Sequence, residues 1–332
     1  MLSRLSDVLP GLAVAMAVAA LAWGLEWLEL SLFGAAYVDG LVLAILIGTL
    51  LHTGIGLSPR LAAGIRFAAK TVLEIAIVLL GGTISAQVVL AAGPGMIVGV
   101  ALVVTLALGL SYGLSRLLGL DARLATLVAC GNSICGNSAI MATAPVIEAP
   151  AKDVAASIAF TAALGIVLVL LLPLGFRLSG LSQWQYGVVA GLSVYAVPQV
   201  LAATVPVGVV STQVGTLVKL MRVLMLGPVV LLLGLRRGRA ARLPLAVLVP
   251  WFIIGFLLMI AARSLGLVPE VAVPGLRTVS GLLTLVAMAA LGLSVDLRSV
   301  MASGGRVLAA GALSIVVLLA LALGAALLLA PA

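Results

Sequence analysis

Hydrophobic residues fill the chain in long runs, and polar residues are collected in short gaps between them. A helix rises about 1.5 Å per residue, so about 20 apolar residues cross the hydrocarbon core of a membrane. The gaps carry turn residues such as Gly93-Pro94-Gly95 and are too short for a soluble domain. Measured in this way, the runs predict eleven spanning helices: 9–30, 38–57, 67–91, 94–118, 123–146, 154–177, 184–206, 210–235, 244–265, 275–295 and 306–330.

Composition supports an all-α polytopic membrane protein. Of 332 residues, 64% are hydrophobic and 8% are charged, far less charge than a water-facing surface needs. A net charge of +8 would indicate nucleic acid for a soluble protein, but basic residues also collect in the cytoplasmic loops of membrane proteins. We therefore expect a multi-pass protein of the bacterial inner membrane, surrounded by lipid, with no nucleic-acid partner. The first run continues to Leu30, which favours a spanning helix over a cleaved signal peptide.

The basic residues orient the predicted helices. With a cytoplasmic N-terminus, the outer gaps hold only Lys152, Arg263 and Arg277. Thirteen basic residues against three is the positive-inside pattern, and eleven spans then place the C-terminus outside. The thirteen predicted to be cytoplasmic are Arg4, Arg60, Arg66, Lys70, Arg116, Arg123, Arg177, Arg236, Arg237, Arg239, Arg242, Arg298 and Arg306.

Two predicted helix ends, five spans apart, read alike: residues 115–120 are SRLLGL and residues 262–267 are ARSLGL. A repeat of five spans must be inverted, because five is odd, and inverted repeats with discontinuous helices are typical of secondary transporters. We expect one membrane transporter domain over 1–332. It would contain an extra N-terminal helix at 1–37, a first inverted repeat at 38–178 and a second at 179–332.

Residues 129–142, ACGNSICGNSAIMA, place two Gly-Asn-Ser triplets inside the fifth span. Glycine lets the helix unwind, and the polar side chains can satisfy the freed backbone groups in lipid. The second half-helix would then present free N–H donors and a partial positive charge to an anion. The alternative is close helix packing with Asn and Ser as interhelical glue. The predicted site residues here are Asn132, Ser133, Gly136, Asn137 and Ser138.

Two cations, Lys219 and Arg222, fall near the middle of the eighth span. Each costs about 2.5–3.5 kcal/mol or more at that depth, so we expect an anionic substrate to balance them rather than snorkelling of both side chains. In the seventh span, Pro198 separates Tyr195 and Gln199. These two side chains either line the same cavity or satisfy a proline kink.

The positions of the other ionisable residues bear on two further functions, cation antiport and enzyme activity. Nine of the ten acidic residues lie at span ends, and the tenth, Glu74, has Lys70 one helical turn before it. This pattern disfavours cation antiport, which needs carboxylates at depth. His52 is the lone histidine, and Cys130 and Cys135 match neither a metal nor a disulfide pattern. We expect no enzyme activity and no cofactor, with Na⁺ or H⁺ as the coupling ion if there is one. A Cys–His52 intramembrane enzyme is the alternative.

Several stretches together resemble the YeiH-like sulfate exporter family: Gly64–Phe67, Ile77–Gly81, Ser133–Gly136, Ser193-Val194, Gln199-Val200, Lys219-Leu220, Arg222-Val223 and Ala287–Leu293. The resemblance implies kinship with the sodium/proton antiporter and bile-acid symporter folds. Spans 5 and 10 would then be a crossed pair of discontinuous helices in a core domain that moves against a panel domain. Tyr195 and Ala196 stand where that family often has His and Glu, which calls proton coupling through that pair into question.

The sequence therefore predicts a secondary transporter of a small anion, such as sulfate, sulfite, an organosulfonate or a dicarboxylate. The alternatives are a sodium-coupled organic anion symporter of the same fold and an anion channel. Glycine-rich faces can serve either a homodimer contact or the sliding of domains.

Overall fold

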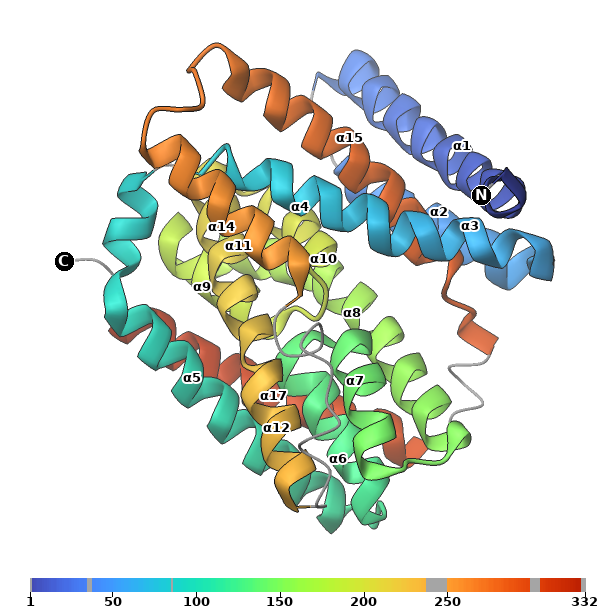
Figure 1. The fold of residues 1–332 in the computed structure, drawn as a ribbon, viewed down its shortest axis with the longest axis vertical. Coiled ribbons are helices and arrows are strands. Elements are labelled where there is room, and N and C mark those ends of the chain that lie inside the picture. The colour runs from blue at the N-terminus through green and yellow to red at the C-terminus, as the bar shows by residue number, and fades with distance from the viewer. Residues whose placement is uncertain (1, 35–37, 85, 237–249, 299–304, 330–332) are drawn as a thin grey trace. The chain divides into compact units, whose positions relative to one another are not determined.

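The computed structural model describes residues 2–34, 38–84, 86–236, 250–298 and 305–329, and these are helical with short connections (Figure 1). Lys70 lies in a π-helical turn that joins α3 to α4. The predicted cytoplasmic residues Arg237, Arg239 and Arg242 lie outside the described residues. The helices are α1 Leu2–Phe33, α2 Gly40–Ile55, α3 Ala62–Phe67, α4 Leu73–Gly81, α5 Ala86–Leu117, α6 Ala122–Cys130, α7 Asn137–Ile147, α8 Ala151–Ser179, α9 Gln183–Ser193, α10 Val197–Thr204, α11 Val209–Leu224, α12 Leu226–Arg236, α14 Trp251–Ser264, α15 Ala272–Leu293 and α17 Gly305–Leu328.

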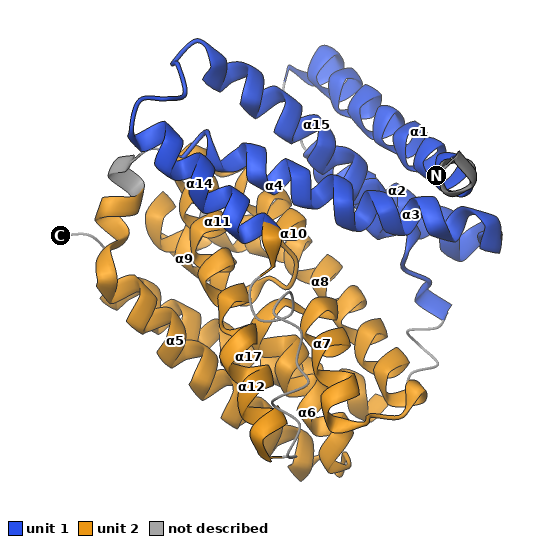
Figure 2. Ribbon diagram, viewed as in Figure 1, with its two compact units in different colours: residues 1–86, 252–298 blue, residues 87–251, 299–332 orange. Residues whose placement is uncertain are grey.

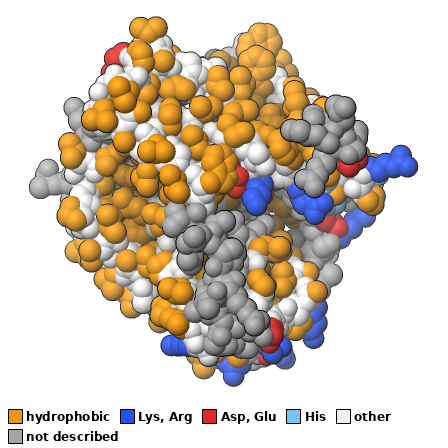
Figure 3. Space-filling view, in the orientation of Figure 1, with side chains coloured by type: hydrophobic (Ala, Val, Ile, Leu, Met, Phe, Trp, Pro, Cys, Tyr) orange, Lys and Arg blue, Asp and Glu red, His pale blue; other side chains and the backbone are white. Residues whose placement is uncertain are grey.

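The predicted membrane character is confirmed. Among the described residues, six stretches of helix are long and apolar enough to cross a bilayer: 7–33, 89–117, 151–176, 209–236, 272–293 and 305–328. Many large apolar side chains on these helices are exposed, and hydrophobic atoms cover most of the face in Figure 3. Such a surface is stable against hydrocarbon and not against water.

One predicted interruption is found in the structure. The Gly93-Pro94-Gly95 stretch was expected to separate two spans, and the helical conformation breaks there, because Gly93 within α5 adopts the non-helical φ 57° and ψ 179°. α5 therefore consists of two helical segments joined by a sharp kink. Pro94 lacks an N–H and fits the first position of the helical segment that follows.

The chain forms two compact units, each built from both halves of the sequence (Figure 2). Unit 1 comprises residues 1–86 and 252–298. Within it, α2 and α15 approach closely where Gly48 meets Gly292, since a Cβ on Gly48 would lie 2.6 Å from the carbonyl oxygen of Ala289. α15 is continuous from Ala272 to Leu293, so the expected discontinuity of the tenth span is not found.

Unit 2 comprises residues 87–251 and 299–332. Among its described residues, one apolar cluster joins Phe160 and Leu168 of α8 to Tyr195, Val200 and Ile315. α9 packs along α11, where glycine at Gly187 and Gly191 lets the two backbones approach.

The fifth predicted span is a helical hairpin and not a single crossing. A Cβ placed on Gly131, which follows α6, would lie 2.9 Å from Cδ1 of Ile140 on α7, although nine residues of straight helix would separate the two by about 14 Å. Leu127 and Ile147, from the two arms, share one apolar cluster. The chain runs up α6, through a π-helical turn at Gly131–Cys135, and reverses at Gly136 into α7. We call this the first hairpin.

The seventh predicted span is a second hairpin. The hydroxyl of Tyr186 on α9 donates 2.7 Å to the carbonyl oxygen of Ala203 on α10, a pair that straight helix would separate by about 25 Å. The side chain of Gln183, where α9 starts, packs against Gly208, which follows α10. The turn lies at Val194–Ala196. The prediction of a proline kink is therefore wrong, because Pro198 sits in the first turn of the returning arm.

Candidate functional site

The tips of the two hairpins touch each other inside unit 2. Gly136, at the turn of the first hairpin, has φ 65° and ψ −124°, and a Cβ placed on it would lie 3.1 Å from Cβ of Tyr195. The Tyr195 hydroxyl donates 3.1 Å to Oδ1 of Asn132. The resemblance implied that spans 5 and 10 form the discontinuous pair; within unit 2 the interrupted segments that meet are spans 5 and 7.

Lys219 on α11 is hydrogen-bonded to the tips of both hairpins. Its side chain is completely buried. Nζ donates 2.7 Å to the carbonyl oxygen of Ile134 in the first hairpin and 2.9 Å to that of Val194 in the second. Both acceptors belong to the end of an outgoing arm, where carbonyl groups lack partners within the helix.

Arg222, one turn further along α11, makes the same kind of bridge and is also completely buried. Its Nε donates 2.7 Å to the carbonyl oxygen of Ser133, and Nη1 donates 3.1 Å to that of Val194. Nη2 donates to the carbonyl oxygen of Asn132. The planar fork of arginine suits this set of three carbonyls.

These contacts revise the role expected for the two cations. Lys219 and Arg222 were predicted near the middle of a span. They lie within the helical stretch 209–236, which is long and apolar enough to cross a bilayer, but their donors are directed at backbone carbonyls. A helix C-terminus carries a partial negative charge of about half an elementary charge. The cations therefore cap the negative ends of the outgoing arms α6 and α9.

The returning arms leave the opposite helix ends at the same place. α7 starts at Asn137 and α10 at Val197, and the contact of Gly136 with Tyr195 brings these starts together. Each N-terminus carries free N–H donors and a partial positive charge. The tip is accessible here, because Ser138 is exposed and Asn137 is partly exposed.

The remaining predicted site residues support the tips. Gln199 is buried and its Oε1 accepts 3.1 Å from the backbone N–H of Ala196, so it caps α10. Asn132 and Ser133 are buried, and Asn132 Nδ2 and Ser133 Oγ have no partner among the described residues. Thus the structure brings the nine predicted residues into one region but exposes only Asn137 and Ser138 there.

Sequence reasoning missed Thr161 of α8. Its hydroxyl donates 2.7 Å to Oδ1 of Asn137 and so fixes the side chain at the start of α7. A signal was present, since Ser157 and Thr161 are polar positions one turn apart in an otherwise apolar span. Both residues are buried.

The charges around the tips are unbalanced. Unit 2 contains three acidic residues, Asp121, Glu148 and Asp153, and they lie at the start of α6, the end of α7 and the first turn of α8. Among the described residues, every hydrogen-bond acceptor found for Lys219 and Arg222 is a backbone carbonyl. The described residues also contain no group of His, Cys, Asp and Glu suited to a metal.

Comparison with known proteins places the chain among bacterial membrane proteins. Residues 10–311 match the family described as Conserved hypothetical protein 698. A UPF0324 membrane protein of Brucella melitensis is 55% identical over 325 residues, covering 97% of this chain and 91% of the relative. One from Agrobacterium fabrum is 54% identical over 322 residues, covering 96% and 93%. One from Bacillus cereus is 36% identical over 280 residues, covering 82% and 81%.

No solved structure matches the chain. The relatives' names state a membrane protein and no substrate.

Proposed function

The chain belongs to the family described as Conserved hypothetical protein 698, and we propose that it is a secondary transporter of a small anion. The substrate would be an oxyanion such as sulfate or sulfite, as the sequence resemblance implies, or an organosulfonate or dicarboxylate. It would bind where the starts of α7 and α10 converge. Asn137 and Ser138 would contact it, while Asn132, Ser133, Gly136, Tyr195 and Gln199 hold the tips in place.

The charge balance at the tips is the observation that carries the proposal. Two helix C-termini contribute about one negative charge in total, and the two N-termini contribute about one positive charge. Lys219 and Arg222 add two full positive charges when protonated. The excess of about two positive charges, buried at this depth, favours an anion and opposes a cation.

The hydrogen bonds of Lys219 and Arg222 to backbone carbonyls disfavour the alternative of a sodium-coupled symporter with sodium bound at the tips. Sodium would need carbonyl oxygens of the unwound segments as ligands. The carbonyls of Ser133, Ile134 and Val194 already accept hydrogen bonds from the two cations. A sodium ion at the tips would also be repelled by those charges.

The hairpins offer a route to alternating access. The first hairpin begins and ends near the start of α8, since α7 is followed at once by Ala151, and the second begins after the end of α8 at Ser179. α8 is 29 residues long, enough to cross a bilayer. Opening one tip would expose the anion to one side of the membrane, and opening the other tip would expose it to the opposite side.

The test is uptake of labelled sulfate, sulfite, taurine and dicarboxylates into proteoliposomes, with and without proton and sodium gradients. Asn137→Asp is the critical variant, because it keeps the size and the Oδ1 acceptor for Thr161 and adds a negative charge. Aspartate suits the first turn of a helix, so folding should be preserved. We expect anion uptake to fall at least tenfold while the unfolding midpoint stays unchanged.

Ser182→Asp is the matched control. It adds the same charge at the exposed start of α9, at the base of a hairpin instead of its tip, and should leave uptake intact. Equal uptake by wild type and Asn137→Asp would remove the anion site from the tips. Absence of uptake of every anion by folded wild type would remove the proposed substrate class.

A further inference from the structure

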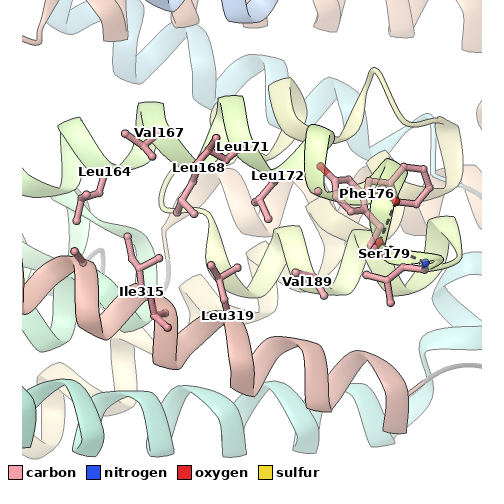
Figure 4. Close-up of a pocket in the computed structure, with 15 residues that line it drawn as sticks. Leu164, Val167, Leu168, Leu171, Leu172, Phe176, Ser179, Val189, Ile315 and Leu319 are labelled. Carbon is pink, nitrogen blue, oxygen red and sulfur yellow. Dashed lines mark hydrogen bonds between the residues drawn. The ribbon is translucent and has the colours of Figure 1, made fainter.

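A groove with a volume of about 430 Å³ runs between α8, α9 and α17 of unit 2. Leu164, Leu168 and Leu172 of α8 face Ile315 and Leu319 of α17 across it, as Figure 4 shows. Val189 of α9 also lines it (Figure 4). The groove therefore contacts the outgoing arm of the second hairpin, at a place separate from the proposed anion site.

The lining offers nothing to a polar ligand. Only Ser179 and Tyr186 have polar side chains among the lining residues. The Ser179 hydroxyl donates 3.0 Å to the carbonyl oxygen of Phe176, and the Tyr186 hydroxyl is bonded to Ala203. An ion or sugar placed here would lose its hydration without replacement, whereas a hydrocarbon would not.

The rim of the groove faces the lipid. Val167, Leu171 and Val316 are 45%, 58% and 62% exposed, and they lie on helices long and apolar enough to span a bilayer. Hydrocarbon is the surrounding medium for such a surface. The groove is therefore continuous with the acyl region of the membrane.

The length of the groove matches one leaflet. From Leu164 to Phe176 is 12 residues, about 18 Å of helix, against about 15 Å for half of the hydrocarbon core. Leu164 lies one turn beyond Thr161, which bonds to the hairpin tip, and the other end of the groove lies at the end of α8.

We propose that one acyl chain of a membrane phospholipid occupies the groove between α8, α9 and α17 and braces the second hairpin. The lipid's acyl chain would pack against α9 in the place of protein side chains. Removing the lipid would therefore destabilise α9, the outgoing arm of the second hairpin. The proposal does not depend on which solute is transported.

The test compares delipidated wild type with Leu172→Trp and Leu164→Trp, which fill the groove from partly buried positions. Leu102→Trp is the matched control, since Leu102 is 58% exposed on α5. Native mass spectrometry counts bound palmitoyl-oleoyl phosphatidylglycerol, and thermal unfolding measures its stabilising effect. Glycerol phosphate serves as the headgroup alone.

We expect wild type and Leu102→Trp to retain one lipid and to unfold several degrees higher when the phospholipid is added. Both groove variants should lose that lipid and that shift, and glycerol phosphate should have no effect on any protein. The proposal is overturned if the groove variants retain the same lipid and the same shift as the control, or if glycerol phosphate alone reproduces the shift.

Discussion

Tyr195 and Asn132, 63 residues apart in sequence, are joined by a buried hydrogen bond of 3.1 Å between the tips of the two hairpins. The second polar atom of that amide, Asn132 Nδ2, has no partner among the described residues. The contact therefore gives Asn132 its one side-chain hydrogen bond in the described part of the chain.

Removing the hydroxyl by Tyr195→Phe should destabilise unit 2 by about 1–3 kcal/mol, because the Asn132 oxygen would be left buried and unpaired. The unfolding midpoint in detergent measures the effect. Tyr112→Phe is the control, since Tyr112 is 39% exposed on α5. Equal midpoints for the two variants would contradict the role of this bond.

Gly136→Ala should be harmful for a different reason. The backbone conformation of φ 65° and ψ −124° is strained for any residue except glycine. In addition, the new Cβ would lie only 3.1 Å from Cβ of Tyr195. We expect a loss of about 1–3 kcal/mol in stability together with reduced anion uptake. Gly113→Ala, in open space on α5, should instead stabilise by about 0.5–1 kcal/mol. Similar stability of both variants would argue against a strained turn.

Composition and local pattern predicted much of the architecture. The apolar runs located the long helices, and the two Gly-Asn-Ser triplets located the interruption at the first tip. They did not indicate the direction of the chain after the interruption. A run of apolar residues has the same composition whether it crosses the membrane or returns, and the reversal depends on contacts such as that of Gly131 with Ile140.

The charge count could not reveal the hairpins either. A hairpin returns to the side on which it began, so every loop after it moves to the opposite side of the membrane from the one predicted. The second hairpin reverses this change, so only the two loops at the ends of α8 change sides. Lys152 moves to the predicted cytoplasmic side and Arg177 leaves it, and the ratio remains thirteen to three. The ratio of basic residues on the two sides is the same with and without the hairpins. It therefore supports the orientation of the other helices but does not determine the number of spans.

The apparent repeat of residues 115–120 and 262–267 has a local structural cause. Gly119 and Gly266 both have positive φ, 81° and 73°. Leu120 N–H donates to the carbonyl oxygen of Ser115, and Leu267 N–H to that of Ala262. Both are the glycine-ended C-cap that many helices use. The similarity of the two sequences is therefore explained by the shared C-cap and is not evidence for an inverted repeat.

The hairpin topology can be tested by labelling single cysteines with a membrane-impermeant maleimide. Arg123 and Lys152 are exposed at the starts of α6 and α8, and Asp153 lies within electrostatic range of Asp121 and Arg123. We therefore expect Arg123→Cys and Lys152→Cys to react from the same side and Ser182→Cys from the opposite side.

Wild type is the control for this labelling, because Cys130 and Cys135 are buried and should not react. If Lys152→Cys reacted only from the side opposite to Arg123→Cys, residues 123–146 would cross the membrane once and the first hairpin would be wrong.

A separate prediction concerns unit 1, where Asp39 precedes α2. Its Oδ1 accepts 2.9 Å from the N–H of Leu41 and caps the helix. Burial raises the pKa of Asp39 to about 6, with a further increase from the charge of Glu26 and opposing effects from the backbone N–H groups of Leu41 and Val42. The folded protein therefore holds this proton more tightly than the unfolded chain, whose aspartate has its usual pKa of 3.8.

Stability should accordingly fall as the pH rises from about 4 to about 6 and then level off, by at most about 3 kcal/mol for this group. Asp39→Asn keeps an oxygen to cap α2 and removes the charge beside Glu26. We expect its unfolding midpoint to exceed that of wild type at pH 7.5 and to equal it at pH 4, measured by thermal unfolding in detergent across that range. Asp121→Asn is the control, since Asp121 is an exposed cap of the same kind on α6, and it should show no such gain at pH 7.5. A lower midpoint for Asp39→Asn at pH 7.5 would mean that the ionised carboxylate stabilises unit 1, contrary to the raised pKa of the partly buried Asp39.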